Sequence, residues 1–197
     1  MKIGILALQG DVPEHAAAIA RSGAEPHLIR QRGDLGQFDG LGLPGGESTT
    51  ISLLLDRTGL RSALAEWTSE GRPTLGTCAG LVLLASTVVD GRPEQRGLGG
   101  LDVVVRRNGH GRQRSSFEAS VPCTALGGSF EAVFIRAPRI LETGPAVEVL
   151  AAIGTGDDAE AVIVRQGSVI GCAFHPELAG DDRLHQELIE QVRSTTG

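Results

Sequence analysis

Three residue types that together cleave amide bonds, a cysteine, a histidine and a glutamate, occur in two short motifs of this 197-residue sequence. Cys78 lies in a Gly-x-Cys-x-Gly motif at residues 76–80, which follows an apolar run and precedes the helical run 81–85. Such a turn needs small flanking residues, because its backbone is strained and closely packed. The N-terminal N–H groups and positive dipole end of the following helix favour the thiolate, which is the attacking species. The motif predicts a nucleophile; on local grounds alone, a small buried residue at a tight strand–helix junction is the alternative.

The other two cysteines lack this setting. Cys123 follows a proline in a turn-like segment, and Cys172 lies inside an apolar run. Free cysteines are usually small buried residues, so both are expected to be structural. Three cysteines make an odd count with no paired spacing, which argues against a disulfide framework.

A cysteine nucleophile requires a general base, and the base requires a third group that fixes its tautomer. His175 and Glu177 supply both, separated by Pro176 and preceded by the apolar run 169–174. Because proline restrains its own φ and disfavours a helical residue before it, an extended segment can bring the imidazole and the carboxylate together. A lone histidine near a strand end is more often structural, but the pairing with Cys78 favours the catalytic interpretation. The remaining histidines are expected to be structural or solvated, namely His15, His27, His110 and His185.

Two further patterns carry little weight. Residues 40–45 match Gly-x-Gly-x-x-Gly, but the first two glycines fall within an expected strand, and this context excludes a dinucleotide site. Cys172, His175 and Glu177 resemble a short group of metal ligands, yet no second cluster accompanies them. We expect neither a metal nor a cofactor.

Length and composition favour one globular domain over residues 1–197, since 41% of the residues are hydrophobic. The net charge of -6 and the absence of a basic run argue against nucleic acid as a partner. No apolar run approaches the roughly 20 residues of a membrane span. The first apolar stretch, 2–8, is too short and too soon interrupted for a signal peptide, so a cytoplasmic protein is expected.

The spacing of apolar residues predicts the elements that position the motifs. Strands are expected at 2–8, 26–30, 39–43 and 73–77, and helices at 14–22, 49–56, 60–70 and 79–86. This alternation implies a mostly parallel sheet with helices on both faces. Further strands are expected at 102–107, 116–121, 131–136, 147–153, 159–165 and 168–174, followed by a helix at 182–193. The second half is therefore expected to be β-rich and partly antiparallel.

The motifs together resemble the class I (triad) glutamine amidotransferases. Within that group the sequence is similar to the PdxT/SNO family, the glutaminase subunits of pyridoxal 5'-phosphate synthase, over nearly its whole length. The segments that carry the resemblance are 4–11, 43–50, 76–80, 107–108, 111–113, 116–118, 133–138 and 171–177. The Pro-Gly-Gly-Glu-Ser and Phe-Ile-Arg-Ala-Pro segments are more specific than the triad. The resemblance implies a three-layer, flavodoxin-like α/β fold.

The resemblance also assigns residue roles: Cys78 is the nucleophile, His175 the base and Glu177 its orienter. The residues that it implies line the glutamine site are Gly46, Glu47, Ser48, Arg107, Ile135 and Arg136. The glycine-rich turn before Glu47 has few side-chain atoms, so its backbone N–H groups can approach a ligand closely. Ser48 is expected to cap a helix that begins at Thr49. The N–H groups of Gly46 and Ala79 are the expected oxyanion hole.

Arg107 and Arg136 suit the α-carboxylate of a free amino acid or the positioning of a loop; otherwise they are exposed arginines at strand ends. The sequence departs from the family at Gly109 and His110, where a small residue and then an aromatic are usual. Packing beside Arg107 is therefore expected to differ.

The resemblance implies hydrolysis of L-glutamine through a thioester, with ammonia delivered to a synthase subunit in a hetero-oligomeric complex for pyridoxal 5'-phosphate (vitamin B6) synthesis. It also implies little activity until the synthase organises the oxyanion hole. Three alternatives stay open at this point. They are a glutaminase of another pathway, such as histidine or purine synthesis, a binding or regulatory subunit with a silent triad, and a redox-sensing cysteine protein.

Overall fold

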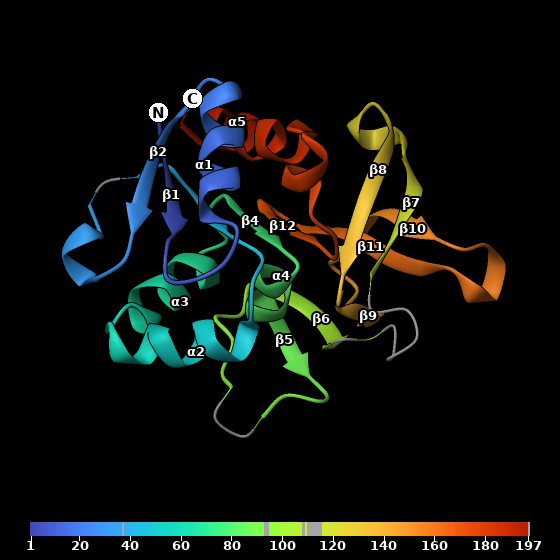
Figure 1. Cartoon of the computed structure of the whole chain (residues 1–197), viewed down its shortest axis with the longest axis horizontal. Helices are drawn as coiled ribbons and strands as arrows, with labels where there is room; N and C mark the ends of the chain where they lie inside the picture. Colours follow the sequence, from blue (N-terminus) through green and yellow to red (C-terminus); the bar gives the residue numbers. More distant parts are fainter. Residues whose placement is uncertain (37, 93–94, 108, 110–115, 197) are drawn as a thin grey trace.

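The central feature of the fold is a seven-stranded sheet, seen in a computed structural model that describes residues 1–36, 38–92, 95–107, 109 and 116–196 (Figure 1). Its strands run in the order β10-β11-β12-β4-β3-β1-β2. Their bounds are β1 Lys2–Leu6, β2 Glu25–Ile29, β3 Gly40–Leu43, β4 Thr74–Thr77, β10 Glu148–Ile153, β11 Glu160–Gln166 and β12 Val169–Cys172. The five strands from β12 to β2 are parallel to one another. Strand β11 pairs antiparallel with β12 on one side and with β10 on the other. The mostly parallel sheet expected from the sequence is confirmed.

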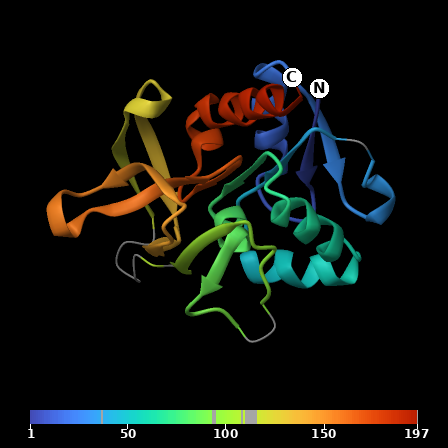
Figure 2. The same ribbon diagram turned by 180° about the vertical axis from the view of Figure 1, so that it is seen from behind.

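Helices cover both faces of this sheet (Figures 1 and 2). On one face lie α1, Val12–Arg21, and α5, Arg183–Thr196. On the other lie α2, Ser48–Arg57, α3, Arg61–Ser69, and α4, Ala79–Leu84. Short 3-10 helices occur at Arg32–Asp34 (η1), Thr124–Leu126 (η3), Gly156–Asp158 (η4) and Pro176–Ala179 (η5).

Two smaller sheets make the second half β-rich, as expected. One contains β5, Ala85–Val88, β6, Leu101–Arg106, and β9, Arg139–Thr143. The other is the antiparallel hairpin of β7, Ser116–Cys123, and β8, Gly128–Ile135.

Two details differ from the sequence-based expectation. The helix expected at 79–86 ends at Leu84, and Ala85 already has the extended dihedrals φ -62 and ψ 142. The spacing of residues in a short, fully apolar run does not distinguish a helix from a strand. Here the pairing of β5 with β6 makes the segment extended. Strand β9 was not predicted, because its five residues alternate too briefly and are held by pairing with β6.

The carboxyl ends of the parallel strands meet at one edge of the sheet, where ligand sites of open α/β sheets form. The chain leaves β1 into residues 7–11, β3 into 44–47, β4 at Cys78 and β12 toward His175. The buried apolar core beneath is continuous from Ile3 to Val192. None of the helices in the described ranges is long and apolar enough to cross a membrane.

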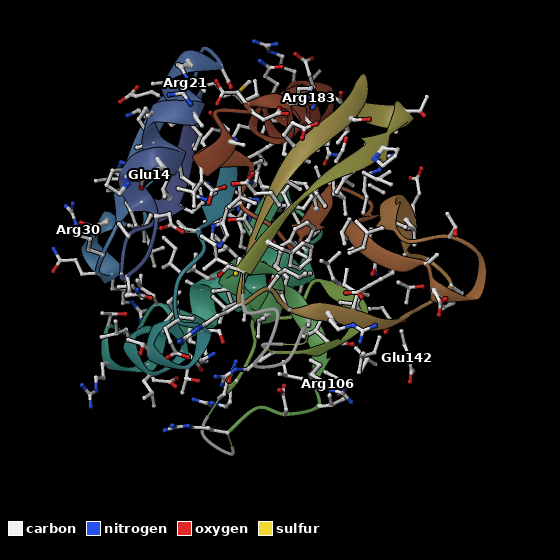
Figure 3. All side chains as sticks on the ribbon, turned by 45° about the vertical axis from the view of Figure 1, so that its right-hand side comes forward. Glu14, Arg21, Arg30, Arg106, Glu142 and Arg183 are labelled. Carbon is white, nitrogen blue, oxygen red and sulfur yellow. The ribbon has the colours of Figure 1, made fainter. Side chains whose placement is uncertain are left out.

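The start of α5 is tied to two neighbouring elements. Arg21 of α1 donates to both carboxylate oxygens of Asp182, at 2.8 and 2.7 Å. Arg183 donates to the carbonyl oxygens of Leu126 in η3 and Ser129 in β8, at the turn of the β7–β8 hairpin, at 3.0 and 2.7 Å. Figure 3 shows these two arginines on α1 and near the hairpin. The position of α5 relative to α1 is therefore fixed by charged contacts as well as by the core.

Candidate active site

Cys78 lies at a strained turn between β4 and α4. Its dihedrals, φ 46 and ψ -100, are outside the regions that side-chain-bearing residues favour. A Cβ on Gly80 would lie 2.0 Å from the carbonyl oxygen of Leu43, and one on Gly76 would lie 2.6 Å from Leu84 Cδ1, so glycine is required on both sides. The Cys78 N–H donates to the carbonyl of Cys172 at 2.8 Å. The strand–turn–helix context expected of a nucleophile elbow is present.

His175 follows β12 and is held by its own backbone. Its N–H donates to the carbonyl of Val133 at 3.0 Å, and Pro176 begins η5 directly after it. The ring Nδ1 lies 2.8 Å from Glu177 Oε1, and both side chains are buried. Glu177 therefore fixes the imidazole with Nδ1–H toward the carboxylate, which turns Nε2 away from Glu177.

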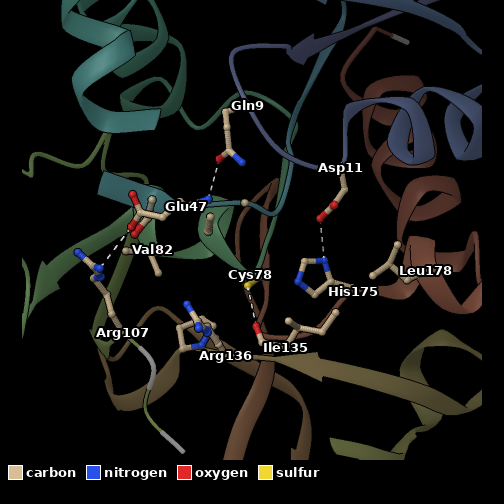
Figure 4. A pocket seen from close by; sticks show the side chains of 14 residues that line it. Gln9, Asp11, Glu47, Cys78, Val82, Arg107, Ile135, Arg136, His175 and Leu178 are labelled. Atoms are coloured by element: carbon tan, nitrogen blue, oxygen red, sulfur yellow. Dashed lines mark hydrogen bonds and ion pairs between the residues drawn. The ribbon is translucent and has the colours of Figure 1, made fainter. Parts of the chain in front are cut away.

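Asp11 is a second carboxylate beside the same ring and was not assigned a role from the sequence. Its Oδ2 lies 3.2 Å from His175 Nδ1 (Figure 4). A Cβ on Gly45 would lie 2.3 Å from His175 Cε1 and 2.8 Å from Asp11 Oδ2. The absence of a side chain at residue 45 thus permits this approach. The signal available in the sequence was the position of Asp11 at the end of the family-like segment 4–11.

Electrostatics favour a charged histidine and a charged glutamate. Burial opposes protonation of His175, but its contacts with Asp11, Cys78 and Glu177 raise its pKa from 6.5 to about 12. Burial likewise opposes ionisation of Glu177, but hydrogen bonds from His15 and His175 hold its pKa well below 4.5. A protonated His175 beside the sulfur suits a thiolate nucleophile and supplies the proton that a leaving amine needs.

Cys78 and His175 face a cavity of about 410 Å³ (Figure 4). All six residues expected to bind glutamine also line it, together with Ala79, Gln9, Asp11, Val82, Pro138 and Leu178; the six are Gly46, Glu47, Ser48, Arg107, Ile135 and Arg136. Glu177 stands behind His175 and does not line the cavity. The cavity accommodates a free amino acid, and the roles of its residues stay predictions.

The cap of α2 is Glu47, and the expectation that Ser48 caps a helix beginning at Thr49 is wrong. The Glu47 carboxylate accepts from the Thr49 and Thr50 N–H groups, at 3.3 and 2.7 Å, and α2 begins at Ser48. A longer side chain reaches the same N–H groups that a shorter cap accepts from. Partial burial opposes ionisation of Glu47, but the bonds from Thr50 and Thr49 lower its pKa. The Ser48 hydroxyl instead accepts from Gln95 Nε2 at 3.2 Å.

Arg107 is positioned by polar contacts on three sides. Its Nη1 donates to Gln95 Oε1 at 2.6 Å and to the Thr49 hydroxyl, and its Nη2 lies 3.3 Å from Glu47 Oε1. Gln95 was not singled out from the sequence, because no motif contains it. The guanidinium is thus joined to the cap of α2 at the cavity wall.

Of the two residues near Arg107 at which the sequence differs from the family, the structure describes Gly109. The Gly109 N–H donates to the carbonyl of Ala137 at 3.0 Å. A Cβ at Gly109 would lie 2.2 Å from Arg139 Cγ, so the glycine packs directly on β9. His110 and the family-like residues 108 and 111–113 lie outside the described residues.

Ile135 and Arg136 reach the cavity from the end of β8. The carbonyl of Ile135 lies 3.8 Å from Cys78 Sγ, and Arg136 has a positive φ of 45. Positive φ in an arginine is uncommon and is found at functional sites. The end of the β7–β8 hairpin therefore places the Ile135 carbonyl beside the Cys78 sulfur and the Arg136 guanidinium at the rim of the cavity.

The group that metal-ligand geometry selects among the described residues is Asp11, His175 and Glu177, whose ligand atoms lie within 4.8 Å of one another. The two carboxylates share the single nitrogen Nδ1, and the 2.8 Å separation from Glu177 is that of a charged hydrogen bond. Cys172, considered above as a possible ligand, is fully buried and donates to the carbonyl of Phe174 at 3.5 Å. Burial raises the pKa of both Cys172 and Cys123, which fits structural thiols.

Residues 5–194 match the SNO glutamine amidotransferase family. A protein of Salinispora arenicola named pyridoxal 5'-phosphate synthase subunit PdxT is 49% identical, with 98% of this chain and 96% of that protein covered. A protein of the same name from Frankia casuarinae is 52% identical at the same coverage. A crystal structure titled glutamine amidotransferase superposes with a TM-score of 0.88 at 44% identity, covering 96% of this chain and 98% of that chain. The fold is thus the α/β class I glutamine amidotransferase fold, and the chain belongs to the SNO glutamine amidotransferase family.

Proposed function

We propose that this chain hydrolyses L-glutamine to L-glutamate and ammonia as the glutaminase subunit of a pyridoxal 5'-phosphate synthase, and supplies that ammonia for vitamin B6 synthesis. The observation that carries the proposal is the meeting of Cys78 and His175 at one cavity, with Glu177 hydrogen-bonded to His175 behind it, in a chain about half identical over its length to proteins named PdxT. The same cavity contains Glu47, whose carboxylate suits the α-ammonium group of an amino acid.

In the first half of the reaction the Cys78 thiolate attacks the side-chain amide carbon of glutamine. The carbonyl electrons move to oxygen, and the Gly46 and Ala79 N–H groups stabilise the oxyanion. His175, protonated on Nε2, gives that proton to the amide nitrogen. The C–N bond breaks, ammonia leaves, and a γ-glutamyl thioester with neutral His175 remains.

In the second half a water molecule attacks the thioester carbon while His175 Nε2 accepts its proton. The C–S bond breaks, glutamate is released, and the thiolate–imidazolium pair is restored. Glu177 keeps Nδ1–H of His175 in place throughout and supports the positive ring. Arg107 and Arg136 bind the α-carboxylate of glutamine at the cavity wall and rim.

The proposed partner is the synthase subunit that uses the ammonia, in a hetero-oligomeric complex. A cytoplasmic location and the absence of a membrane partner belong to the same proposal, and the absence of a nucleic-acid partner rests on the acidic composition. We treat residues 1–197 as one glutamine amidotransferase domain, because one apolar core extends from β1 to α5.

The test is glutamate release from glutamine by the chain alone and with the synthase subunit, with Cys78→Ala as the blank. Release that rises strongly with the synthase and is absent in the blank is the expected result. Release that the synthase leaves unchanged would keep the glutaminase and reject the pathway. No Cys78-dependent release under either condition would favour a silent binding subunit.

A further inference from the structure

Two buried histidines continue the polar chain behind Glu177. His15 on α1 and His185 on α5 are both 0% exposed. His15 Nε2 lies 3.5 Å from Glu177 Oε1 and 3.0 Å from the Thr77 hydroxyl, in the residue before Cys78. His185 Nε2 lies 3.0 Å from His15 Nδ1. A line of polar contacts thus runs from the cavity to the far helix.

The direction of hydrogen bonding along this line follows from its buried end. His185 Nδ1 is buried with no hydrogen-bond partner among the described residues. A buried N–H without a hydrogen-bond partner is rarer in proteins than a buried acceptor without one. The unpartnered Nδ1 of His185 is therefore the acceptor nitrogen, and the ring proton lies on Nε2. His185 then donates to His15 Nδ1, which leaves the proton of His15 on Nε2, facing Thr77 and Glu177. In this arrangement both rings point an N–H toward the active site.

The surroundings of His185 support its neutral state. Burial lowers its pKa from 6.5 to about 3. The titratable groups whose fields reach it are His15, whose charged form would oppose protonation most strongly, Glu177 and Asp182, which favour protonation, and Arg21, which opposes it. Because Arg21 and Asp182 are paired with each other, their fields largely cancel at the ring.

The Glu177 carboxylate needs such donors. It is buried and charged, its Oε1 faces His175 and His15, and its Oε2 has no partner among the described residues. A buried charge that lacks donors is costly, and the carboxylate would turn or take up a proton. Either change would release the ring of His175.

We propose that His15 and His185 are positioning residues for glutamine hydrolysis: His185 fixes the tautomer of His15, whose Nε2–H holds Glu177 charged and aligned with His175. This inference rests on the proposed function. It extends the triad of Cys78, His175 and Glu177 to a line of five residues that includes His15 on α1 and His185 on α5. The packing of these two helices is thereby coupled to the nucleophile.

The tautomers provide a test that does not depend on activity. Two-bond ¹H–¹⁵N spectra of the full-length chain distinguish Nε2–H, Nδ1–H and doubly protonated rings, with the His15→Gln and His185→Gln variants used for assignment. We expect Nε2–H tautomers for both rings at pH 7. An Nδ1–H tautomer for either, or a doubly protonated His15, would overturn the proposal.

The functional test uses the residue farthest from the substrate. In His185→Leu no donor faces His15 Nδ1, so His15 can take the opposite tautomer and present a bare Nε2 to Glu177. We expect kcat of the complex to fall about tenfold with KM nearly unchanged, as for other residues that orient a catalytic group. His185→Gln keeps an N–H donor near the position of Nε2 and is expected to recover most of kcat.

Two controls separate positioning from folding. Leu188→Val trims a buried α5 side chain with no polar role and is expected to leave kcat per reactive Cys78 unchanged, with reactive sites counted by a glutamine-like electrophile. If His185→Leu matches Leu188→Val, or if His185→Gln is as slow as His185→Leu, the positioning role is wrong. If wild type itself shows no Cys78-dependent activity, the proposed function fails instead, while the tautomers still report on the line.

Discussion

Asp11 Oδ2 lies 3.2 Å from His175 Nδ1, although the two residues leave different strands of the sheet, β1 and β12. The same nitrogen faces Glu177 at 2.8 Å, and it has one proton to donate. Glu177 is fully buried whereas the Asp11 side chain is 31% exposed, so the hydrogen bond belongs to Glu177. Asp11 then acts mainly as a negative charge beside a positive ring.

These different roles predict that kcat falls by different factors when Glu177 and Asp11 are each replaced by the neutral amide. Glu177→Gln presents an amide to Nδ1 and removes the buried charge that supports the imidazolium, so kcat is expected to fall on the order of 10³-fold. Asp11→Asn leaves the hydrogen bond from Glu177 in place and is expected to lower kcat about tenfold or less. Steady-state glutamate release by the complex measures both. Equal losses in the two variants would contradict the assignment.

The charges of the pair also predict a pH window for stability. His175 has a pKa raised from 6.5 to about 12, so its stabilisation is complete below pH 6.5 and is lost as the pH rises toward 12. Glu177 has a pKa lowered from 4.5, so its stabilisation is complete above pH 4.5 and is lost as the pH falls. Both contributions are complete between pH 4.5 and 6.5.

The Tm difference between wild type and the double variant His175→Asn/Glu177→Gln, which carries neither charge, is therefore expected to be largest in that window. It should shrink on both sides when Tm is followed from pH 4 to 9. A difference that rises up to about pH 6.5 and then stays level to pH 9 would show that His175 is neutral in the folded protein.

Residues in local motifs could be identified from the sequence, while those brought together by packing could not. The elbow at Cys78 and the His-Pro-Glu segment each lie within a few residues, so their neighbours in sequence are also neighbours in space. His15 and His185 are 170 residues apart, and only the packing of α1 against α5 brings them together. A lone histidine on a helix carries no sign of that contact.

Errors in the predicted elements have the same origin. Strand β9 and the end of α4 depend on pairing with β6, which no local pattern displays. The cap of α2 was misplaced because serine is the more frequent cap, whereas a glutamate one residue earlier reaches the same N–H groups. The parallel strands β1 to β4 lie close to their predicted positions, since buried strands read as continuous hydrophobic runs.

Strain at Cys78 predicts a difference between two inactive variants. Alanine at residue 78 keeps a Cβ at φ 46, whereas glycine adopts that dihedral without penalty. Cys78→Gly is expected to have a free energy of unfolding about 1 kcal/mol higher than Cys78→Ala. Ala65→Gly in α3 is the matched control, where the same exchange should destabilise by about 1 kcal/mol. Urea unfolding measures both, and the same sign at the two positions would exclude strain at the elbow.

The close approach of Gly45 to His175 predicts a steric variant. In Gly45→Ala the new methyl group would meet His175 Cε1 at 2.3 Å, so the ring must move away from Cys78. We expect kcat to fall by at least about tenfold while the far-UV circular dichroism spectrum is unchanged. Gly33→Ala adds the same methyl group where nothing lies within 4 Å and should retain full activity. Wild-type activity in Gly45→Ala would show that the loop after β3 yields and does not fix the ring.

Glu47 joins two functions that substitution can separate. Its carboxylate caps α2 through Thr49 and Thr50, and it lies 3.3 Å from Arg107 at the cavity wall. Glu47→Ala should lower the free energy of unfolding by about 1 kcal/mol through the lost cap, and should raise KM for glutamine about tenfold through the lost charge. Glu47→Ser restores a cap acceptor without the charge, so stability should recover while KM stays high. If stability and KM recovered together, the carboxylate would act on substrate binding only by holding the start of α2 in place.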